Sequence, residues 1–336
     1  MDSLTQIILG AAVAEVVAGK KIGNKAPLWG AIAGTIPDLD VFMRYFYHPI
    51  DAALVHRGFS HSILFAVLCS PIFAFIVHHI YRKKFLYKTW FWLFFFGIIT
   101  HPMLDMFTNY GTQFFWPLDY RITFNTVFVV DPLYTLPFGL CVLIILFLKP
   151  INRWRSKINL FGIYYSTCYL IWGVLVKLFI FSNSTNYFSE ANYKAKNIMV
   201  TPMPLTSFYW MMLGEDEANY YVGYKSIFKP FQPKDIDVIP KNHTKLDSLI
   251  WRDVAYSNKL KFISNNYYNL EVKKDTVFFY DLRFGVLSKL TNNKIRTPLM
   301  GYEIIHKENL VLKVNQTRSK NLFRFVDFDA YMNWIF

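Results

Sequence analysis

Cysteine is scarce in this chain of 336 residues, and its pattern excludes a disulfide framework. Cys69, Cys141 and Cys168 each lie inside an apolar run, and no two of them are spaced as Cys-x-x-Cys. We interpret them as small buried apolar residues, because free cysteine is among the most buried residue types.

Acidic residues are also few, 23 against 36 lysines and arginines, and the net charge is +13. A charge of that size can indicate nucleic-acid binding. In the N-terminal half, however, many lysines and arginines stand in short clusters between apolar runs, as in the cytoplasmic loops of membrane proteins. We therefore expect the lipid bilayer, and no nucleic acid, as a partner.

The N-terminal stretch, residues 1–19, lacks the basic segment of a cleavable signal peptide and carries Glu15 within its apolar run. We expect it to be a retained first membrane helix, in which Glu15 packs against or pairs with another residue.

Long apolar runs dominate the first half of the chain, and the whole chain is 54% hydrophobic with a mean hydropathy of +0.23. A membrane-spanning helix needs about 20 residues. The second run is short and rich in glycine, so we expect it to pack closely against its neighbours. We predict a polytopic α-helical membrane domain over residues 1–184, with about six segments at 3–18, 26–37, 60–80, 89–108, 132–148 and 159–181.

The loops between these runs differ in charge. The loops at 19–25, 81–88 and 149–158 hold eleven lysines and arginines, whereas the opposite side holds only Arg44, Arg57 and Arg121. Because cytoplasmic loops carry the positive excess, we expect both termini outside the cytoplasm. The predicted location is the inner (plasma) membrane, crossed several times.

After residue 184 no run is long enough to span a membrane. Stretches at 219–228, 266–287 and 301–316 mix alternating, β-branched and aromatic residues between Gly, Asn and Asp, which is typical of strands. The end, at 322–336, is predicted to be a short amphipathic helix or a last strand. We therefore expect residues 185–336 to form a water-exposed, extracytoplasmic domain that is β-rich or α+β.

Polar side chains gather at the predicted outer ends of the segments. Ionisable residues at membrane depth are costly and usually functional, although a lone histidine at a helix end is more often a cap, as we expect for His48. The clustered residues are Asp38 and Asp40, then His56, Arg57 and His61, then His101 and Asp105, and finally Asp131.

Their chemistry suits a metal centre. His101 and Asp105 are four residues apart and share one helix face, and imidazole with carboxylate ligation fits zinc or another divalent ion. We predict the metal ligands Asp38, Asp40, His56, His61, His101 and Asp105, with Asp38 and Asp40 as ligands or as a general base. The set is large enough for more than one ion. Arg57, as a bidentate phosphate clamp, and Asp131 are the predicted catalytic residues.

Four motifs resemble a known family, the bacterial inner-membrane metal-dependent hydrolases, long grouped as a domain of unknown function. They are "MDSLTQ", "GTIPDLD", "HRGFSHS" and "HPMLDMFTNYGTQFFWP", with weaker likeness at "TPMPLTSFYWMM" and "VFFYDLRFG". The resemblance implies a membrane-embedded, metal-dependent hydrolase, with His and Asp ligands similar to those of zinc-dependent phospholipase C enzymes. Gln6 departs from the family, which often has histidine there. Either this position lies outside the ligand set or one ligand is missing.

We therefore expect a membrane-bound metal-dependent hydrolase with zinc as the favoured ion, acting on a phosphoester or lipid-type substrate at the outer membrane face. The alternative is a non-enzymatic membrane protein, either a metal-binding scaffold or a transporter. A transporter should carry its ionisable residues near mid-membrane, whereas these gather at one face. A third reading is that the second domain binds a partner or envelope polymer and the first only anchors it.

Overall fold

A computed structural model describes residues 1–243, 254–286, 298–307, 310–318 and 328–336 of the chain. The chain divides into two compact units. The first unit comprises Met1–Met43, Val55–Val174 and Pro204–Thr206, and the second comprises Arg44–Leu54, Leu175–Met203 and Ser207–Phe336.

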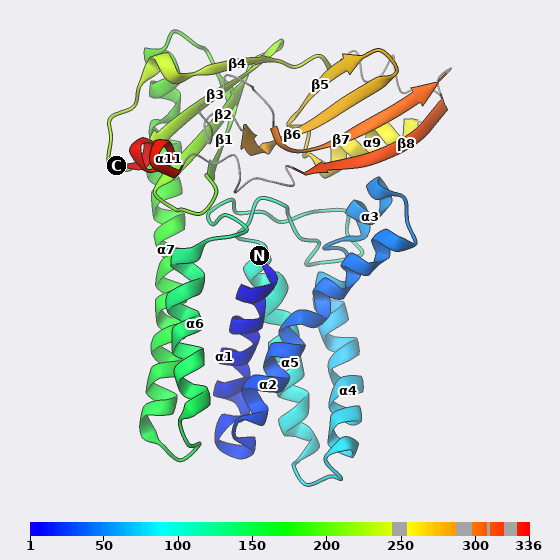
Figure 1. Ribbon diagram of the computed structural model, residues 1–336, viewed down its shortest axis with the longest axis vertical. Coiled ribbons are helices and arrows are strands. Elements are labelled where there is room, and N and C mark those ends of the chain that lie inside the picture. The colour runs from blue at the N-terminus through cyan, green and yellow to red at the C-terminus, as the bar shows by residue number, and fades with distance from the viewer. Residues whose placement is uncertain (244–253, 287–297, 308–309, 319–327) are drawn as a thin grey trace. The chain divides into compact units, whose positions relative to one another are not determined.

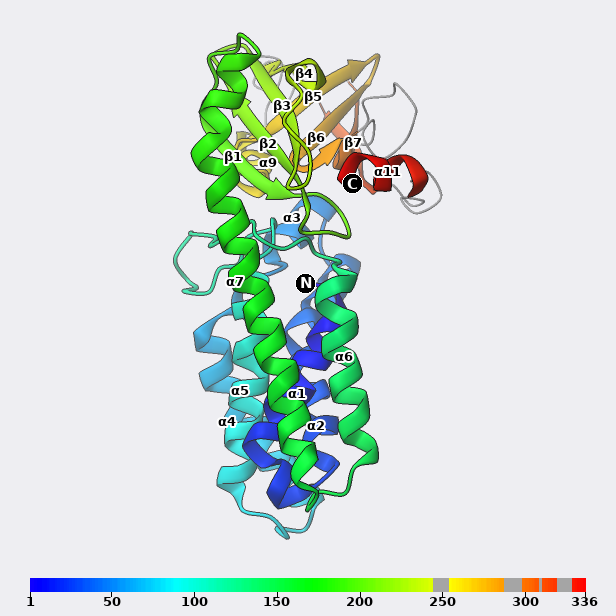
Figure 2. The same ribbon diagram turned by 90° about the vertical axis from the view of Figure 1, so that its left-hand side faces the viewer.

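The first unit is a bundle of helices that run side by side (Figures 1 and 2). Short 3-10 helices, η1 and η2, precede or interrupt the long helices at one end of the bundle. The elements are α1 (Ser3–Ile22), α2 (Lys25–Thr35), η1 (Ile36–Tyr45), η2 (Phe59–His61), α4 (Ile63–Ile80), α5 (Tyr87–Asp105), α6 (Pro132–Phe147) and the first part of α7 (Arg153–Glu190).

Small residues bring α1 and α2 into close contact. A Cβ atom on Gly10 would lie 2.2 Å from the carbonyl oxygen of Gly30, and one on Gly34 would lie 2.5 Å from the carbonyl oxygen of Gln6. Only glycine fits such approaches, which are typical of helices packed in membranes. The predicted close packing of the second apolar run is therefore confirmed.

Each of the six apolar runs forms a helix, but six spans are not confirmed. By length and composition, three described helices can cross a membrane: α1, α4 and α7. Helix α2, with 11 residues, and helix α6, with 16, are shorter than the roughly 17–25 residues that a spanning helix needs. Helix α5 has 19 residues, but its last turn is polar, with His101, Pro102 and Asp105.

A buried ion pair joins α1 to α7. Arg155 donates from Nε to Oε1 of Glu15 at 2.7 Å and from Nη2 to Oε2 at 2.8 Å. The same guanidinium donates to the carbonyl of Leu148 at 2.7 Å and to the side chain of Asn24. Each of the three guanidinium nitrogens thus donates to an oxygen, in a bundle where an unpaired charge would be costly. Glu15 is the partner residue that we expected.

The second unit contains two four-stranded antiparallel sheets, in the orders β1-β2-β3-β4 and β5-β6-β7-β8. The predicted β-rich region is confirmed. Its strands are β1 (Lys196–Pro202), β2 (Tyr209–Glu215), β3 (Asn219–Ser226), β4 (Asp237–Pro240), β5 (Tyr268–Lys273), β6 (Thr276–Val286), β7 (Pro298–Lys307) and β8 (Leu310–Arg318).

The described residues of the second unit also form helices, which besides the end of α7 are α3 (Pro49–Val55), η3 (Pro233–Asp235), α9 (Val254–Ile263) and α11 (Phe328–Ile335). Ile50 of α3 is fully buried against Leu260 of α9 and the second sheet. Within the predicted C-terminal stretch, Phe328–Ile335 forms the amphipathic helix of the two expected forms, while 322–327 lies outside the described residues. Helix α7 continues to Glu190, past residue 184, where we predicted the domain boundary.

We predict that Glu15→Gln destabilises the first unit by about 3–5 kcal/mol, because it leaves the buried Arg155 guanidinium without a counter-charge. Thermal unfolding of the detergent-purified protein should show a clearly lower midpoint than wild type. Lys21→Gln removes a charge from an exposed position of the same helix and should leave the midpoint close to wild type. Equal midpoints for Glu15→Gln and Lys21→Gln would show that the pair contributes little.

Candidate metal centre

The site residues come from three turns of the first unit that end next to one another. Asp38 and Asp40 lie in η1, which follows α2 directly, and His61 closes η2. Ser62 then caps α4, its hydroxyl accepting from the backbone nitrogen of Phe65 at 3.0 Å. The last turn of α5 supplies two further side chains. The "PDLD", "HRGFSHS" and "HPMLD" stretches thus meet because each sits at a helix boundary at the same end of the bundle.

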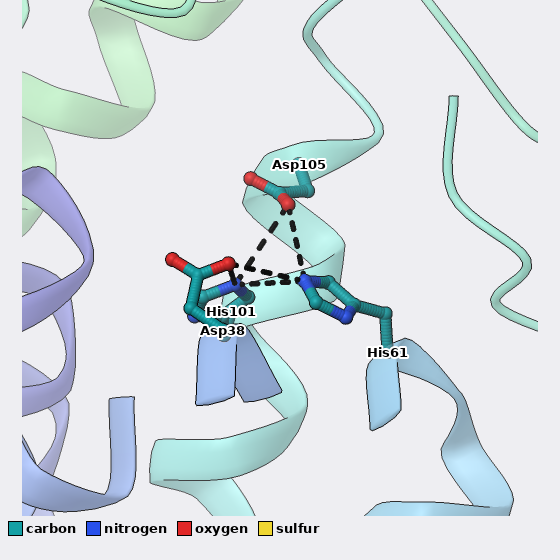
Figure 3. A group of neighbouring side chains, drawn as sticks. All are labelled: Asp38, His61, His101 and Asp105. Atoms are coloured by element: carbon teal, nitrogen blue, oxygen red, sulfur yellow. Dashed lines mark hydrogen bonds and ion pairs between the residues drawn. The ribbon is translucent and has the colours of Figure 1, made fainter. Parts of the chain in front are cut away.

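Four side chains aim one donor atom each at a common point, as Figure 3 shows: Asp38, His61, His101 and Asp105. The two imidazole Nε2 atoms are 3.2 Å apart. Oδ1 of Asp38 lies 3.5 and 3.4 Å from them, and Oδ2 of Asp105 lies 3.5 and 3.7 Å from them. All four donor atoms lie within 4.8 Å of one another.

These separations match the edges of a small tetrahedron. Zinc binds imidazole nitrogen and carboxylate oxygen at about 2.1 Å, so a tetrahedral set of such ligands has edges of about 3.4 Å. Five of the six edges are 3.2–3.7 Å in the structure. The four donors therefore fit a divalent ion.

The hydrogen bonds behind the histidines fix which nitrogen faces the centre. Nδ1 of His101 is 2.5 Å from the carbonyl oxygen of Gly34, which can only accept, so Nδ1 carries the proton. Nδ1 of His61 lies 2.9 Å from the Ser60 hydroxyl and 3.2 Å from Oδ2 of Asp40. The Nε2 atoms are left to present lone pairs to a metal, in the outer-shell arrangement usual for metal-binding histidines.

Asp105 is a buried carboxylate with two cationic partners. Its Oδ2 forms an ion pair with Nε of Arg57 at 3.0 Å. Its Oδ1 accepts from Nε2 of Gln6 at 2.8 Å and from the Met1 amino group. The same Oδ2 lies 3.5–3.7 Å from the two imidazole Nε2 atoms, so it can also serve as a ligand to a divalent ion at the centre of the four donors. Gln6 stands behind Asp105 and outside the ligand group, the first of the two possibilities raised by its departure from histidine.

Asp40 is surrounded by donors of the protein itself. Its Oδ2 accepts from the Ser60 hydroxyl at 2.6 Å and from the Arg57 backbone nitrogen at 3.1 Å, and its Oδ1 accepts from Nδ1 of His56 at 2.7 Å. Burial alone would raise the pKa of Asp40, but the hydrogen bonds with His56 and His61 hold that pKa well below its usual range. Asp40 is therefore an ionised anchor for both imidazoles.

A second group of possible ligands combines Asp38, Asp40 and His56. It shares Asp38 with the first group. Nδ1 of His56 and Oδ1 of Asp40 are hydrogen-bonded to each other at 2.7 Å, so these two atoms could bind a metal only by giving up the shared proton. The first group, which offers four donors instead of three, fits an ion better.

Arg57 lies beside the centre and is buried. Its Nη1 donates to Thr108 at 2.8 Å, and its guanidinium lies 4.9 Å from the ring centre of Tyr110. The backbone is left-handed here, with φ at +62°, a conformation that is costly for a residue with a Cβ and that tends to occur at functional sites. In this structure the guanidinium balances the charge of Asp105, while the predicted role as a phosphate clamp stays a prediction.

Asp131 lies apart from both ligand groups. It caps α6, where Oδ1 accepts from the backbone nitrogens of Leu133 at 3.1 Å and Tyr134 at 3.3 Å, and Oδ2 accepts from the Tyr169 hydroxyl at 2.8 Å. This geometry is that of an N-cap. The structure thus brings together the six predicted ligands and Arg57 but not Asp131.

The sequence did not predict the backbone acceptor Gly34 or the side chains that hold Arg57, namely Thr108 and Tyr110. Every residue has a carbonyl oxygen, so residue types cannot show which one accepts a hydrogen bond. The only available signal was the run "GTIPDLD", in which Gly34 precedes the acidic pair.

Comparisons with known proteins place residues 1–180, which include every residue of the centre, in one family, described as "YdjM inner membrane protein". A relative in Bacillus subtilis (strain 168), "Uncharacterized protein YfhP", is 24% identical over 140 residues. That alignment spans 39% of this chain and 42% of the relative, so the chain covers less than half of that protein's length. No solved structure matches the chain. The comparisons support an inner-membrane family, and none of them assigns hydrolase activity.

We predict that Asp40→Ala lowers metal affinity by about 10–100-fold, the usual cost of losing an outer-shell partner of a ligand histidine. The four donors of the first group would remain, but His61 would lose the carboxylate that fixes its ring. Zinc affinity of the purified protein, measured by competition with a chromophoric chelator, tests this. Asp119→Ala, at an exposed position of the same unit, is the control. Unchanged affinity in Asp40→Ala would contradict the anchoring role.

Proposed function

The chain belongs to the family of the YdjM inner membrane protein, and from the geometry of its candidate metal centre we propose that it is a membrane-embedded, metal-dependent hydrolase. Its ion, with zinc favoured, is held by Asp38, His61, His101 and Asp105. The observation that carries the proposal is the convergence of these four donor atoms, with the two imidazole Nε2 atoms 3.2 Å apart and Oδ2 of Asp105 3.5–3.7 Å from both.

The donor set favours zinc. Two imidazoles and two carboxylates suit zinc and other divalent first-row ions better than calcium or magnesium, which prefer oxygen ligands alone. A divalent cation also offsets two buried carboxylates in one step. Once bound, such an ion supplies Lewis acidity toward an ester or phosphoester and activates water for attack.

His56 is the side chain best placed to move a proton. Its Nδ1 donates to Asp40 at 2.7 Å, so its Nε2 is the free basic atom, and the side chain is 28% exposed. Burial lowers the pKa of His56 below its ordinary value despite the hydrogen bond with Asp40. The imidazole is therefore neutral and able to accept a proton at neutral pH, as a histidine oriented by a carboxylate does in general base catalysis.

The substrate class follows from where the site lies along the chain. Helix α4, a candidate membrane span, begins at Ile63, two residues after His61. The nearby connection between α5 and α6 exposes Phe115, Leu118 and Tyr120, whose exposed fractions are 53, 64 and 67%. Exposed aromatic and apolar side chains at a span boundary are typical of the lipid–water interface. Lipid-type phosphoesters are the substrates such a site meets first.

The four-donor geometry also favours a second function, a metal-binding scaffold without catalysis. Zinc sites in which four protein ligands close the tetrahedron are usually structural, whereas catalytic sites keep one position open. Access of a substrate to the ion would depend on Asp38, whose side chain is 20% exposed, because the side chains of His61, His101 and Asp105 are almost fully buried. In the proposed enzyme, Asp38, as the most exposed of the four, would be the ligand nearest the entering substrate.

We predict that His101→Ala loses most of the bound metal, since it removes one of four donors, whereas His56→Ala keeps the metal and lowers hydrolysis by about 10²–10⁴-fold, the range for a general base. The measurements are zinc per chain and the rate of cleavage of bis(p-nitrophenyl) phosphate and of phospholipid in mixed micelles. His79→Ala, at an exposed position near the other end of α4, is the matched control.

The outcomes separate the two functions. Metal retained in His101→Ala would remove the basis of the site. Zinc-loaded wild type that cleaves neither substrate, or His56→Ala as active as wild type, would contradict the hydrolase and leave the scaffold.

We also propose the six-segment topology, in which the second unit lies outside the cytoplasm. Its support is the excess of lysine and arginine in the loops at 19–25, 81–88 and 149–158, since positive loops stay in the cytoplasm. We predict that a reporter fused after Lys88 gives a cytoplasmic signal and one fused after Phe336 an extracytoplasmic signal. A cytoplasmic signal at Phe336 would refute this topology.

A further inference from the structure

A cavity of about 500 Å³ lies in the second unit, formed entirely by residues of that unit. Its volume is in the range of small-molecule sites, about 300–1,000 Å³. Strands β2 and β3, the connection from β3 to β4, and helix α11 enclose it. The lining residues are Tyr209, Tyr224, Ser226, Lys229, Pro230, Gln232, Lys234, Asn333 and Trp334.

The wall made by α11 is fixed to the sheet, so the cavity is preformed. The Ser226 hydroxyl donates to the carbonyl of Ile335 at 2.5 Å, and Nζ of Lys229 donates to the carbonyl of Asn333. The ring of Phe336 stacks on Phe228 with centroids 5.0 Å apart. A wall held by hydrogen bonds and stacking lowers the cost of ordering when a ligand binds.

Aromatic rings supply the apolar surface of the cavity. Tyr209 and Tyr224 stack with centroids 5.9 Å apart and planes 20° from parallel, and both are buried. Trp334 adds an indole that is only partly buried. Flat aromatic faces bind the C–H face of a ring while their polar tips keep hydrogen-bonding capacity. A saccharide ring offers such a face, together with hydroxyls for the amides of Gln232 and Asn333.

The charge of the lining is positive. It contains Lys229 and Lys234 and no carboxylate among its described residues. Behind it, Lys225 is buried, and its Nζ donates to the carbonyls of Ser226 and Lys229. One carboxylate, Asp237, acts from nearby: burial first, and then this charge, raise the pKa of Tyr224, so Tyr224 stays a neutral hydroxyl. Ammonium groups at a pocket rim favour an anionic ligand.

We propose that this cavity binds a saccharide unit that carries an anionic group, either a phosphate or a carboxylate. The Trp334 indole, which is partly exposed while Tyr209 and Tyr224 are buried, stacks on the sugar ring, and Lys234 at the exposed rim meets the anion. The proposal is independent of the metal centre, because every lining residue belongs to the second unit.

The test titrates the full-length, detergent-purified protein after EDTA treatment, so that no metal site competes for the anion. The probes are glucose 1-phosphate and glucuronate, with glucose and inorganic phosphate as controls, and saturation-transfer NMR reports contact with the ring protons. We expect at least one anionic sugar to bind about tenfold or more tightly than glucose or phosphate. The two probes distinguish a phosphate from a carboxylate ligand.

Variants locate the binding. Lys234→Glu should weaken binding of the anionic sugar at least about tenfold, and Trp334→Ala should weaken binding of every sugar. Lys196→Glu makes the same charge change at an exposed position of β1 outside the cavity and should bind as wild type. Failure of both anionic sugars to bind, equally tight binding of phosphate or glucose, or equal losses in Lys196→Glu and Lys234→Glu would overturn the proposal.

Discussion

The first unit depends on four possible metal-ligand atoms that lie close together at its polar end. The two imidazole Nε2 atoms lie 3.2 Å apart, and Oδ2 of Asp105 lies 3.5–3.7 Å from both. Arg57 balances part of the negative charge, with its Nε 3.0 Å from that oxygen, and a cation among the four donors would balance the rest. Because the donors come from η1, η2 and α5, such a cation would link three parts of the chain.

Small residues make that meeting possible. The close approach of Gly10 to Gly30 and of Gly34 to Gln6 sets α2 directly against α1. That position presents the Gly34 carbonyl to His101 and the Gln6 amide to Asp105. The packing of α1 against α2 therefore also orients His101 and Asp105. A methyl group added at Gly30 or Gly34 would move the acceptor that fixes the His101 ring as well as the helix.

The sequence predicted the helices, the strand-rich second half and the residues of the centre. Residue types alone are enough to reveal apolar periodicity and clusters of ionisable residues. The six predicted spans are not confirmed, since a run such as 26–37 is apolar yet forms only 11 residues of helix. The separate roles of Asp40 and Asp38 could not be read from "PDLD". They depend on which oxygen meets Ser60 or His56, a matter of tertiary contact. Asp131 looked equivalent to the other aspartates and is a helix cap.

The pairing of Glu15 with Arg155 has a consequence for how the chain is made. The partners are 140 residues apart in sequence, so at a synthesis rate of about 5–20 residues per second α1 waits roughly 7–28 s for its counter-charge. During that interval a carboxylate sits in an apolar helix with nothing to neutralise it, and release into lipid is unfavourable. Retention of α1 beside the insertion machinery until α7 emerges would keep that charge out of lipid until Arg155 can pair with it.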